Sequence, residues 1–313
     1  MKLTHIINAF VVLLICVALA QAQSDRTFVS AHGTDNSDCG SLDLPCRSFN
    51  TALFKTNAGG EVIALDSGIY DTFNISISQS VTLTAAPGAH VELSNNDNSN
   101  NRITVSAAAG DRVVLRNLYL SRQPGTGSGA FGIGVLRVGV LQVENCVIDG
   151  FTRGIEFLAT GKVYVVDTVV RNSSVGIDLF PNSGTVIAAI ERCRFEKNGD
   201  GLAVEAFGGT IVKASVKDSF TTGQVSVGFR ADAGTGATAE LNIENCLSAN
   251  NDTGIFSFTN VGTATVRVSN TTVTDNTSFG VRATLSGQLL TRGNNTVEGN
   301  GTNGTFTGTF TAK

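Results

Sequence analysis

A glycine followed by a large apolar residue recurs at regular spacing along most of the chain. The glycines of these pairs are Gly132, Gly154, Gly176, Gly201, Gly228, Gly254 and Gly280, and successive ones are 22, 22, 25, 27, 26 and 26 residues apart. Self-similarity with a period of this size is typical of solenoids, whose repeated units stack on one another. The pattern therefore predicts one repetitive architecture rather than two average domains.

Each unit also contains an apolar run that ends in asparagine or aspartate. The end residues are Asn117, Asn145, Asp167, Asp218, Asn245, Asn270 and Asn294, and only Arg192 breaks the row. Asparagine tolerates left-handed backbone and bonds neighbouring backbone groups through its amide, so the row predicts a tight bend at the same place in every unit. A second row of turn residues follows six positions later, at Asn198, Asn251, Asn276 and Asn300.

Each unit thus contains three short strands separated by turns, with no helical stretch between them. A coil of three strands accounts for this if equivalent strands of successive coils pair in parallel about 4.8 Å apart. A leucine-rich repeat is excluded because its L-x-x-L-x-L-x-x-N frame does not recur. A β-sandwich would show hairpin signals instead of a fixed order of turns. The sequence predicts an all-β solenoid of eight or nine coils.

Residues 60 to 300 resemble the right-handed parallel β-helix proteins of the pectin-lyase-like superfamily. The segment RTFVSAHGTDNSDCGSLDLPCRSFNTAL also resembles the opening of exported bacterial β-helix proteins of unassigned role. The resemblance implies a right-handed parallel β-helix with a short amino-terminal capping helix over the first coil. Ser48 to Thr56 can supply this helix, because Phe49, Ala52 and Leu53 are spaced to form one apolar face.

The start of the chain has the features of a secretory signal peptide. A twelve-residue apolar run ends at Ala20, and Ala20-Gln21-Ala22 forms a small-x-small cleavage site. The run is shorter than the roughly 20 residues that a membrane-spanning helix needs, so no stable membrane insertion is expected. We therefore expect a secreted protein, extracellular or periplasmic, with a signal peptide at 1–22, an amino-terminal cap segment at 23–60 and a parallel β-helix domain at 61–313.

Apart from Cys16, which lies in the predicted signal peptide, the cysteines divide into two groups. Cys39 and Cys46 lie in a short loop rich in turn formers, and export allows them to form a disulfide. Cys146, Cys193 and Cys246 each follow the asparagine row directly. The first two are two coils apart, about 9.6 Å, whereas the Cα atoms of a disulfide lie within about 7 Å. We expect these three as buried small residues, with no metal, because no histidines match them.

The charge of the chain offers no surface for nucleic acid. The net charge is −4 at pH 7, charged residues make up 15% of the chain, and no run of Lys or Arg occurs. Proteins that bind DNA or RNA carry a basic patch or stripe, so no nucleic-acid partner is expected. The sequence leaves the oligomeric state open.

The strands that open with the repeated glycine carry the candidate functional residues. Because side chains alternate across a sheet, the second and fourth residues after each glycine point outward. This rule predicts a ligand-binding face made of Glu156, Asp178, Phe180, Glu205, Arg230, Asp232, Phe256 and Phe258. Exposed aromatic rings beside carboxylates suit the binding of sugars, since the rings offer apolar platforms and the carboxylates accept hydrogen bonds.

The same carboxylates permit acid–base chemistry. Glycoside hydrolysis needs two carboxyls, about 5–5.5 Å apart for retention and about 6.5–9.5 Å apart for inversion. Glu156 and Asp178 are expected about 5 Å apart on adjacent coils and Glu205 somewhat further from Asp178, so these three are the candidate catalytic residues. However, the N-T-D, D-D, G-H-G and R-I-K motifs of pectin hydrolases and the R-x-P-x-x-R segment of pectate lyases are missing. No family catalytic residue carries over, which favours a protein that is not an enzyme.

Three functions therefore remain open. The first is a non-catalytic exported protein that contacts polysaccharide or another cell-envelope ligand along the outward face. The second is a polysaccharide lyase or glycoside hydrolase that acts on an acidic glycan, and the third is a structural stalk or adhesin-like scaffold. No cofactor is expected. Calcium is the one candidate ion between outward carboxylates, because it takes oxygen ligands.

Overall fold

The computed structural model describes residues 23–70, 73–95, 101–122 and 130–311. The predicted signal peptide, residues 1–22, lies outside the described residues. Within those residues, no helix has the length and apolar character needed to cross a membrane.

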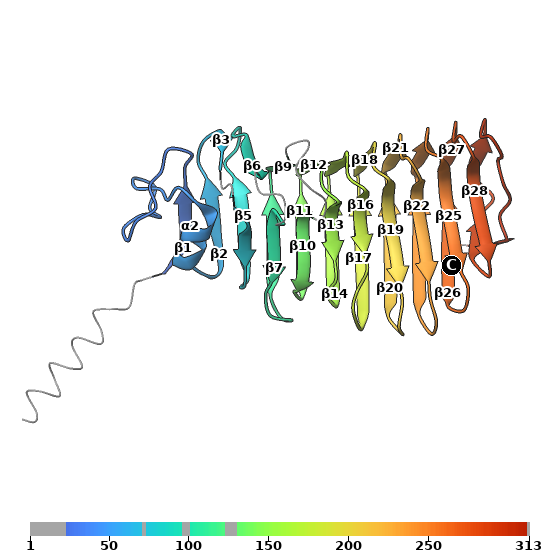
Figure 1. Ribbon diagram of the computed structural model, residues 1–313, viewed down its shortest axis with the longest axis horizontal. Helices are drawn as coiled ribbons and strands as arrows, with labels where there is room; N and C mark the ends of the chain where they lie inside the picture. The colour runs from blue at the N-terminus through green and yellow to red at the C-terminus, as the bar shows by residue number, and fades with distance from the viewer. Residues whose placement is uncertain (1–22, 71–72, 96–100, 123–129, 312–313) are drawn as a thin grey trace, which may run out of the picture.

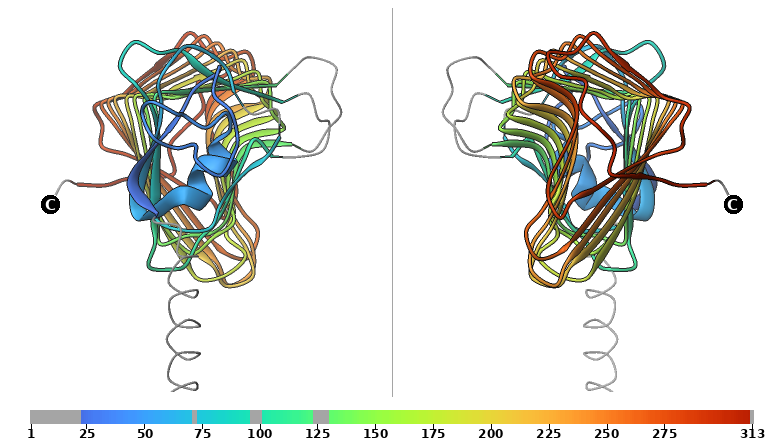
Figure 2. Two further views of the ribbon diagram at one scale, coloured as in Figure 1. Left: turned by 90° about the vertical axis from the view of Figure 1, so that its left-hand side faces the viewer. Right: turned by 90° about the vertical axis from the view of Figure 1, so that its right-hand side faces the viewer.

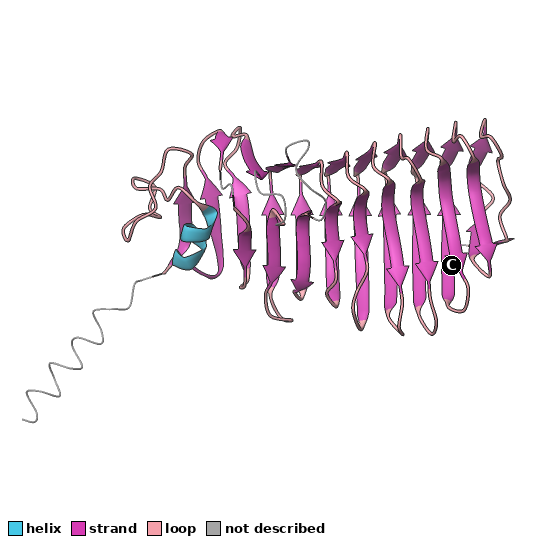
Figure 3. Cartoon of the chain, in the orientation of Figure 1, coloured by secondary structure: helices cyan, strands magenta, loops and turns pink. Residues whose placement is uncertain are grey.

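The described residues form three parallel sheets that run along one elongated body (Figures 1 and 3). The first sheet contains β1 (Ser24–Val29), β2 (Thr56–Ala64), β5 (Val81–Ala85), β8 (Arg112–Arg116), β11 (Val140–Glu144), β14 (Gly161–Val166), β17 (Thr185–Glu191), β20 (Ile211–Lys217), β23 (Thr238–Glu244), β26 (Thr263–Ser269), β29 (Gln288–Thr291) and β31 (Gly308–Thr309). The second sheet contains β3 (Gly68–Ile69), β6 (Val91–Asn95), β9 (Leu118–Arg122), β12 (Val147–Asp149), β15 (Val169–Arg171), β18 (Arg194–Glu196), β21 (Phe220–Thr222), β24 (Leu247–Ala249), β27 (Thr272–Thr274) and β30 (Thr296–Glu298). The third sheet contains β4 (Ile75–Ile77), β7 (Ile103–Ser106), β10 (Phe131–Arg137), β13 (Arg153–Phe157), β16 (Val175–Leu179), β19 (Asp200–Ala206), β22 (Val227–Ala233), β25 (Thr253–Thr259) and β28 (Phe279–Leu285).

The chain visits the first, second and third sheets in turn, and each such cycle is one coil. Strands within each sheet pair in parallel with their equivalents in the coils before and after, and the strands at the two ends of a sheet pair on one side, as the repeat predicted. End-on, the coils superpose closely (Figure 2). Inward side chains such as Ile155, Ile177 and Leu202 are fully buried and form one continuous core. The predicted parallel β-helix is confirmed.

The repeated glycines allow the backbones of adjacent coils to come close together where the third sheet begins. A Cβ atom added to Gly201 would lie 2.4 Å from the carbonyl oxygen of Gly228, and one added to Gly176 would lie 2.4 Å from that of Gly201. These distances are far below van der Waals contact. A side chain at this row would therefore push neighbouring coils apart.

The asparagine row forms the bend between the first and second sheets. Asn145, Asp167, Asn245 and Asn270 all have φ angles between 47° and 51°, in the left-handed region. Arg192, which breaks the row by residue type, has the same conformation, with φ of 49°. The bend is therefore imposed by the coil geometry even where the residue is unsuited to it.

Replacement of Arg192 by asparagine is expected to raise the free energy of unfolding by about 0.5–1 kcal/mol, because asparagine adopts left-handed backbone at lower cost. The ion pairs that Arg192 makes with Asp167 and Glu191 are half exposed and contribute little. Chemical denaturation measures the change. Arg194→Asn is the control, because Arg194 is a nearby exposed arginine without positive φ. An equal gain in stability from Arg194→Asn, or a loss of stability from Arg192→Asn, would contradict the account.

The second asparagine row lies inside the coil and forms a ladder of hydrogen bonds. The backbone N–H of Asn251 donates to the Asn276 side-chain oxygen, and the N–H of Asn276 donates to Asn300 in the same way. Gln224 occupies the corresponding place in its coil and donates to Asn251. These amides are buried, so the ladder satisfies backbone groups that water cannot reach.

The cysteines that follow the asparagine row, Cys146, Cys193 and Cys246, are free and buried, as predicted. Each backbone N–H of Cys146, Cys193 and Cys246 donates to a hydroxyl on the next coil, which belongs to Thr168, Ser219 and Thr271 respectively. Burial raises the pKa of the Cys146 and Cys193 thiols to about 12, so both stay protonated and are poor metal ligands.

The amino-terminal end is closed by the predicted capping helix. Helix α2 (Phe49–Lys55) begins after Ser48, whose hydroxyl accepts a hydrogen bond from the N–H of Thr51. It buries Phe49, Ala52 and Leu53 and lies across the first coil (Figure 2). The predicted disulfide between Cys39 and Cys46 is present in the loop before the helix. At the other end, the two-residue strand β31 pairs with β29.

Candidate functional site

The outer face of the third sheet carries the predicted site residues in two straight rows. Register pairs place Glu156, Asp178, Ala203, Arg230, Phe256 and Arg282 in the first row. The second row contains Glu205, Asp232, Phe258 and Thr284. Glu156 and Asp178 are direct partners on adjacent strands, as expected. Phe180 follows β16 directly and lies beyond its last paired residue.

One arginine binds the two carboxylates of the first row. The Nε of Arg153 lies 2.6 Å from Oδ2 of Asp178 and 3.4 Å from Oε1 of Glu156. Arg153 is the first residue of β13, directly before the repeated glycine, and its register partner is Val175. Arg153 was not among the predicted site residues, because the alternation rule applies to the residues that follow each glycine.

A second arginine gathers three further carboxylates. The Nε of Arg230 lies 2.8 Å from Oδ2 of Asp200, its Nη2 contacts Oε1 of Glu205, and its Nη1 lies 3.8 Å from Oδ2 of Asp232. Asp200, the first residue of β19, also accepts a hydrogen bond from the N–H of Val227. We call the whole group the carboxylate–arginine cluster: Arg153, Glu156, Asp178, Asp200, Glu205, Arg230 and Asp232. Five carboxylates share two arginines.

The expectation that this face is exposed is wrong at the end where Glu156 and Asp178 lie. Glu156 is 6% exposed and Asp178 is 2% exposed, although both point away from the core. The guanidinium of Arg153 contacts both carboxyls and shields them from water. Arg230, Glu205 and Asp232 are half-buried. The alternation rule identified the correct face, but it gave no information about long side chains that fold over one another on that face.

Burial has shifted the acid–base behaviour of the cluster. It raises the pKa of the carboxyls of Glu156, Asp178, Glu205 and Asp232, and the neighbouring arginines offset only part of the rise. Oδ1 of Asp178 has no hydrogen-bond partner among the described residues, and the same holds for Oδ1 of Asp232. A buried oxygen without a partner is costly, so these atoms favour a proton or a bound donor.

Aromatic side chains flank the cluster. Phe180 packs edge-on against Phe207, with ring centroids 5.7 Å apart, and Phe256 lies 6.2 Å from Phe258. Phe180, Phe256 and Phe258 are half-buried rather than fully exposed as expected, whereas Phe207 is exposed. The rings and the cluster together form a continuous surface along the sheet.

Arg282 was missed as a site residue although the outward row included it. Its guanidinium lies 4.7 Å from the ring centroid of Phe279 and 5.7 Å from that of Phe256. The alternation placed Arg282 on this face. The stacking depends on Phe279, which precedes Gly280 and therefore lies outside the alternation that follows the glycine.

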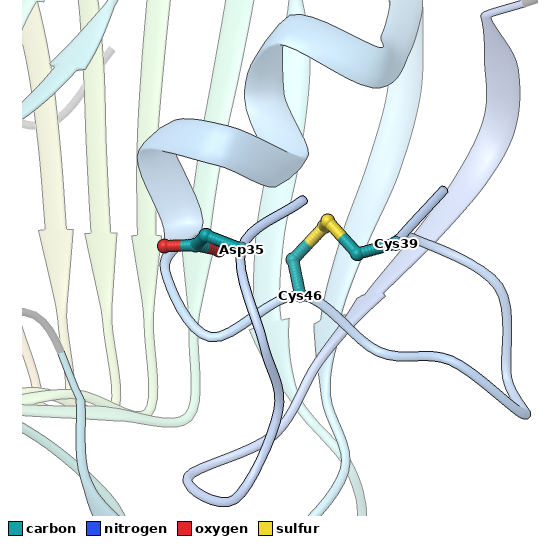
Figure 4. Close-up of side chains that lie close together, drawn as sticks. All are labelled: Asp35, Cys39 and Cys46. Atoms are coloured by element: carbon teal, nitrogen blue, oxygen red, sulfur yellow. A yellow bond between two sulfur atoms is a disulfide. The ribbon is translucent and has the colours of Figure 1, made fainter. Parts of the chain in front are cut away.

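No metal site emerges from the described residues. Asp35, Cys39 and Cys46 form one group close enough to hold an ion (Figure 4), but the two sulfurs are joined in the disulfide. Burial alone would raise the pKa of Asp35, but hydrogen bonds from Ser48 and Arg47 at the start of α2 lower it. In the cluster, guanidinium groups lie where a cation would approach Asp178 and Glu205, so calcium there remains an unsupported prediction.

A separate cavity of about 580 Å³ lies in the cap. It is lined mainly by β1, by the loop that carries Cys39 and by Phe54 and Lys55 at the end of α2. None of the cluster residues lines it. Its position at the amino-terminal end separates it from the rows of the third sheet.

The chain is similar to two solved structures. A structure of XylC in complex with xylose is similar to the chain at 10% identity, with a TM-score of 0.52, over 86% of this chain and 69% of that one. A GH136 lacto-N-biosidase from Eubacterium ramulus is similar at 11% identity, with a TM-score of 0.37, over 88% of this chain and 67% of that one. Among curated proteins, no sequence matches the chain significantly.

The family model described as "Right handed beta helix region" matches residues 74–242. These residues run from just before β4 into β23, so the match includes the strands that carry the whole cluster. It confirms the fold and the handedness implied by the resemblance to pectin-lyase-like proteins. Since the match spans more than half of the sequence, the chain belongs to the right-handed β-helix family.

Proposed function

We propose that the protein is exported and binds a glycan, without cleaving it, along the outer face of the third sheet between Glu156 and Phe258. The observation that carries this proposal is the continuity of the face. From Glu156 to Phe256 the first row crosses four inter-strand steps, about 19 Å, in which polar groups lead directly into aromatic rings. A linear polymer with hydroxyl groups and apolar ring faces matches such a strip.

Two further observations support this function. A disulfide in the cap fits an oxidising compartment, in agreement with the predicted signal peptide. The similar fold of XylC was solved with xylose bound, which makes a sugar ligand a reasonable analogy, although a shared fold does not transfer an activity.

The cluster itself favours binding over catalysis. Asp178 and Glu205 are each held by an arginine, and each ion pair occupies one of the carboxyl oxygens that would otherwise act on a substrate. Arginines with free N–H groups and half-buried carboxylates still offer hydrogen bonds to hydroxyls. The arrangement therefore suits recognition of a polar polymer.

Glycoside hydrolysis is the second candidate, because one observation favours it specifically. Asp178 has a raised pKa and an unpartnered buried oxygen, which suits a carboxyl that holds a proton and gives it to a leaving group. Glu205 lies one strand and two residues away, a backbone separation of about 8 Å. Two side chains at this spacing on one face can place their carboxyls at the separation of about 6.5–9.5 Å that inverting enzymes use.

The binding function predicts that Phe258→Ala lowers the affinity for a glycan about tenfold, because an aromatic side chain that packs against a ligand contributes strongly to binding. The mature protein is titrated against a panel of acidic and neutral plant and bacterial polysaccharides to find the ligand. Leu247→Ala, at an exposed apolar residue on the outer face of the second sheet, is the control and should leave affinity unchanged. No binding by the wild-type protein, or equal losses in both variants, would contradict the proposal.

The same panel decides between binding and hydrolysis. New reducing ends that the Asp178→Asn variant no longer produces would establish hydrolysis and overturn the non-catalytic proposal. Binding without any new reducing ends in the wild-type protein would exclude the second candidate.

A further inference from the structure

We infer that Arg282, held between Phe256 and Phe279, is a binding site for an anionic group, a carboxylate or a sulfate, on the glycan. The inference rests on the proposed function and adds a substrate feature to it. Arg282 lies in the first outward row, two strands beyond Arg230, on the last strand of the third sheet. It is exposed, whereas the arginines of the cluster are partly covered.

The charge of Arg282 is not neutralised by the protein. Arg153 and Arg230 each form ion pairs with two or three carboxylates, but no ion pair joins Arg282 to any described residue. Asp252, on the preceding coil, uses its carboxylate to accept hydrogen bonds from Ser278 and Thr253. The guanidinium therefore keeps its hydrogen-bond donors for a ligand.

The two rings fix the position of that guanidinium. Its central carbon lies 4.7 Å from the centroid of Phe279 and 5.7 Å from that of Phe256. Cation–π contacts of this kind hold the side chain without using its N–H groups. An arginine that is already ordered loses less conformational entropy when it binds, and its planar fork matches the two oxygens of a carboxylate or sulfate.

The distribution of charge along the face predicts the orientation of a bound glycan. The cluster carries five carboxylates against two arginines and disfavours an anionic group over its centre. Arg282 lies about 10 Å from Arg230 along the row, one strand beyond Phe256. An acidic glycan would thus place its anionic group at the β28 end and uncharged rings toward the cluster.

The test uses matched acidic and neutral glycans. Affinities of the mature protein are measured for neutral oligosaccharides that carry a single terminal uronate and for their carboxyl-reduced forms, and for oligosaccharides with a single terminal sulfate and their desulfated forms, at low and high salt. The wild-type protein is expected to bind at least one acidic member about tenfold more tightly than its partner, with the difference reduced by salt. Arg282→Gln should remove this preference and leave binding of the neutral partner unchanged.

Arg292→Gln, at an exposed arginine beyond the end of β29, is the charge-matched control and should keep the preference. Comparing the matched glycans that differ by a carboxylate with those that differ by a sulfate shows which anion the site binds. Equal binding of acidic and neutral partners by the wild type, or an unchanged preference in Arg282→Gln, would overturn the inference while glycan binding itself stands. Absence of binding to any glycan would overturn the proposed function as well.

Discussion

Replacing Arg153 with methionine is expected to lower the free energy of unfolding by about 3–5 kcal/mol at pH 7, because it leaves two buried carboxylates without a counter-charge. Arg153 contacts Asp178 and Glu156, which are 2% and 6% exposed. Methionine keeps most of the length of the side chain and removes only the charge and the donors. Chemical denaturation at a series of pH values measures the loss.

The loss of stability caused by Arg153→Met should become smaller as the pH falls. Burial raises the pKa of Asp178 and Glu156 in the folded chain above their unfolded values, so the folded state binds these protons more tightly. The stability that comes from protonating these two carboxyls is present at acidic pH. It is lost as the pH rises through their raised pKa values. Adding Asp178→Asn to Arg153→Met should restore part of the stability at pH 7. A loss below 1 kcal/mol, or one independent of pH, would contradict the account of the cluster.

Replacing Gly201 with alanine is expected to cost about 3 kcal/mol, because the new methyl group would overlap the backbone of the next coil. The Cβ would lie 2.4 Å from the carbonyl oxygen of Gly228 and 3.3 Å from Cβ of Phe195. Neither backbone can move without disturbing the parallel pairing of β19 and β22. Thermal and chemical unfolding measure the effect.

Gly110 provides the matched control for this substitution. A Cβ there meets nothing within 4 Å, and its φ is not in the left-handed region. Gly110→Ala should therefore leave stability unchanged or raise it slightly, through reduced freedom of the unfolded chain. Equal losses at both glycines would show that close approach of the coils is not the reason for the repeated glycine.

The coil was predictable from the sequence because its constraints are local and recur in every unit. The glycine row marks where backbones approach, and the asparagine row marks the left-handed bend that Arg192 also adopts. The helix from Phe49 was predictable because its cap and its apolar face lie within one short segment. Such features need only the conformational preferences of single residues and the period of the repeat.

The site was predictable only in part. The alternation of side chains placed Asp178 and Arg230 on the same face correctly. It missed Arg153 and Asp200, because their roles depend on how long side chains reach sideways between coils. The burial of Glu156 and Asp178 follows from those same contacts, so no count of residues along one strand could have revealed it.

The most direct test of the proposed binding face is to locate a bound glycan. Crystals of the mature protein grown with the tightest ligand from the panel are expected to show glycan density over the outer face of the third sheet, in contact with Phe258 and extending toward Arg230. Density on the outer face of the first or second sheet, or in the cavity of the cap, would contradict the proposal.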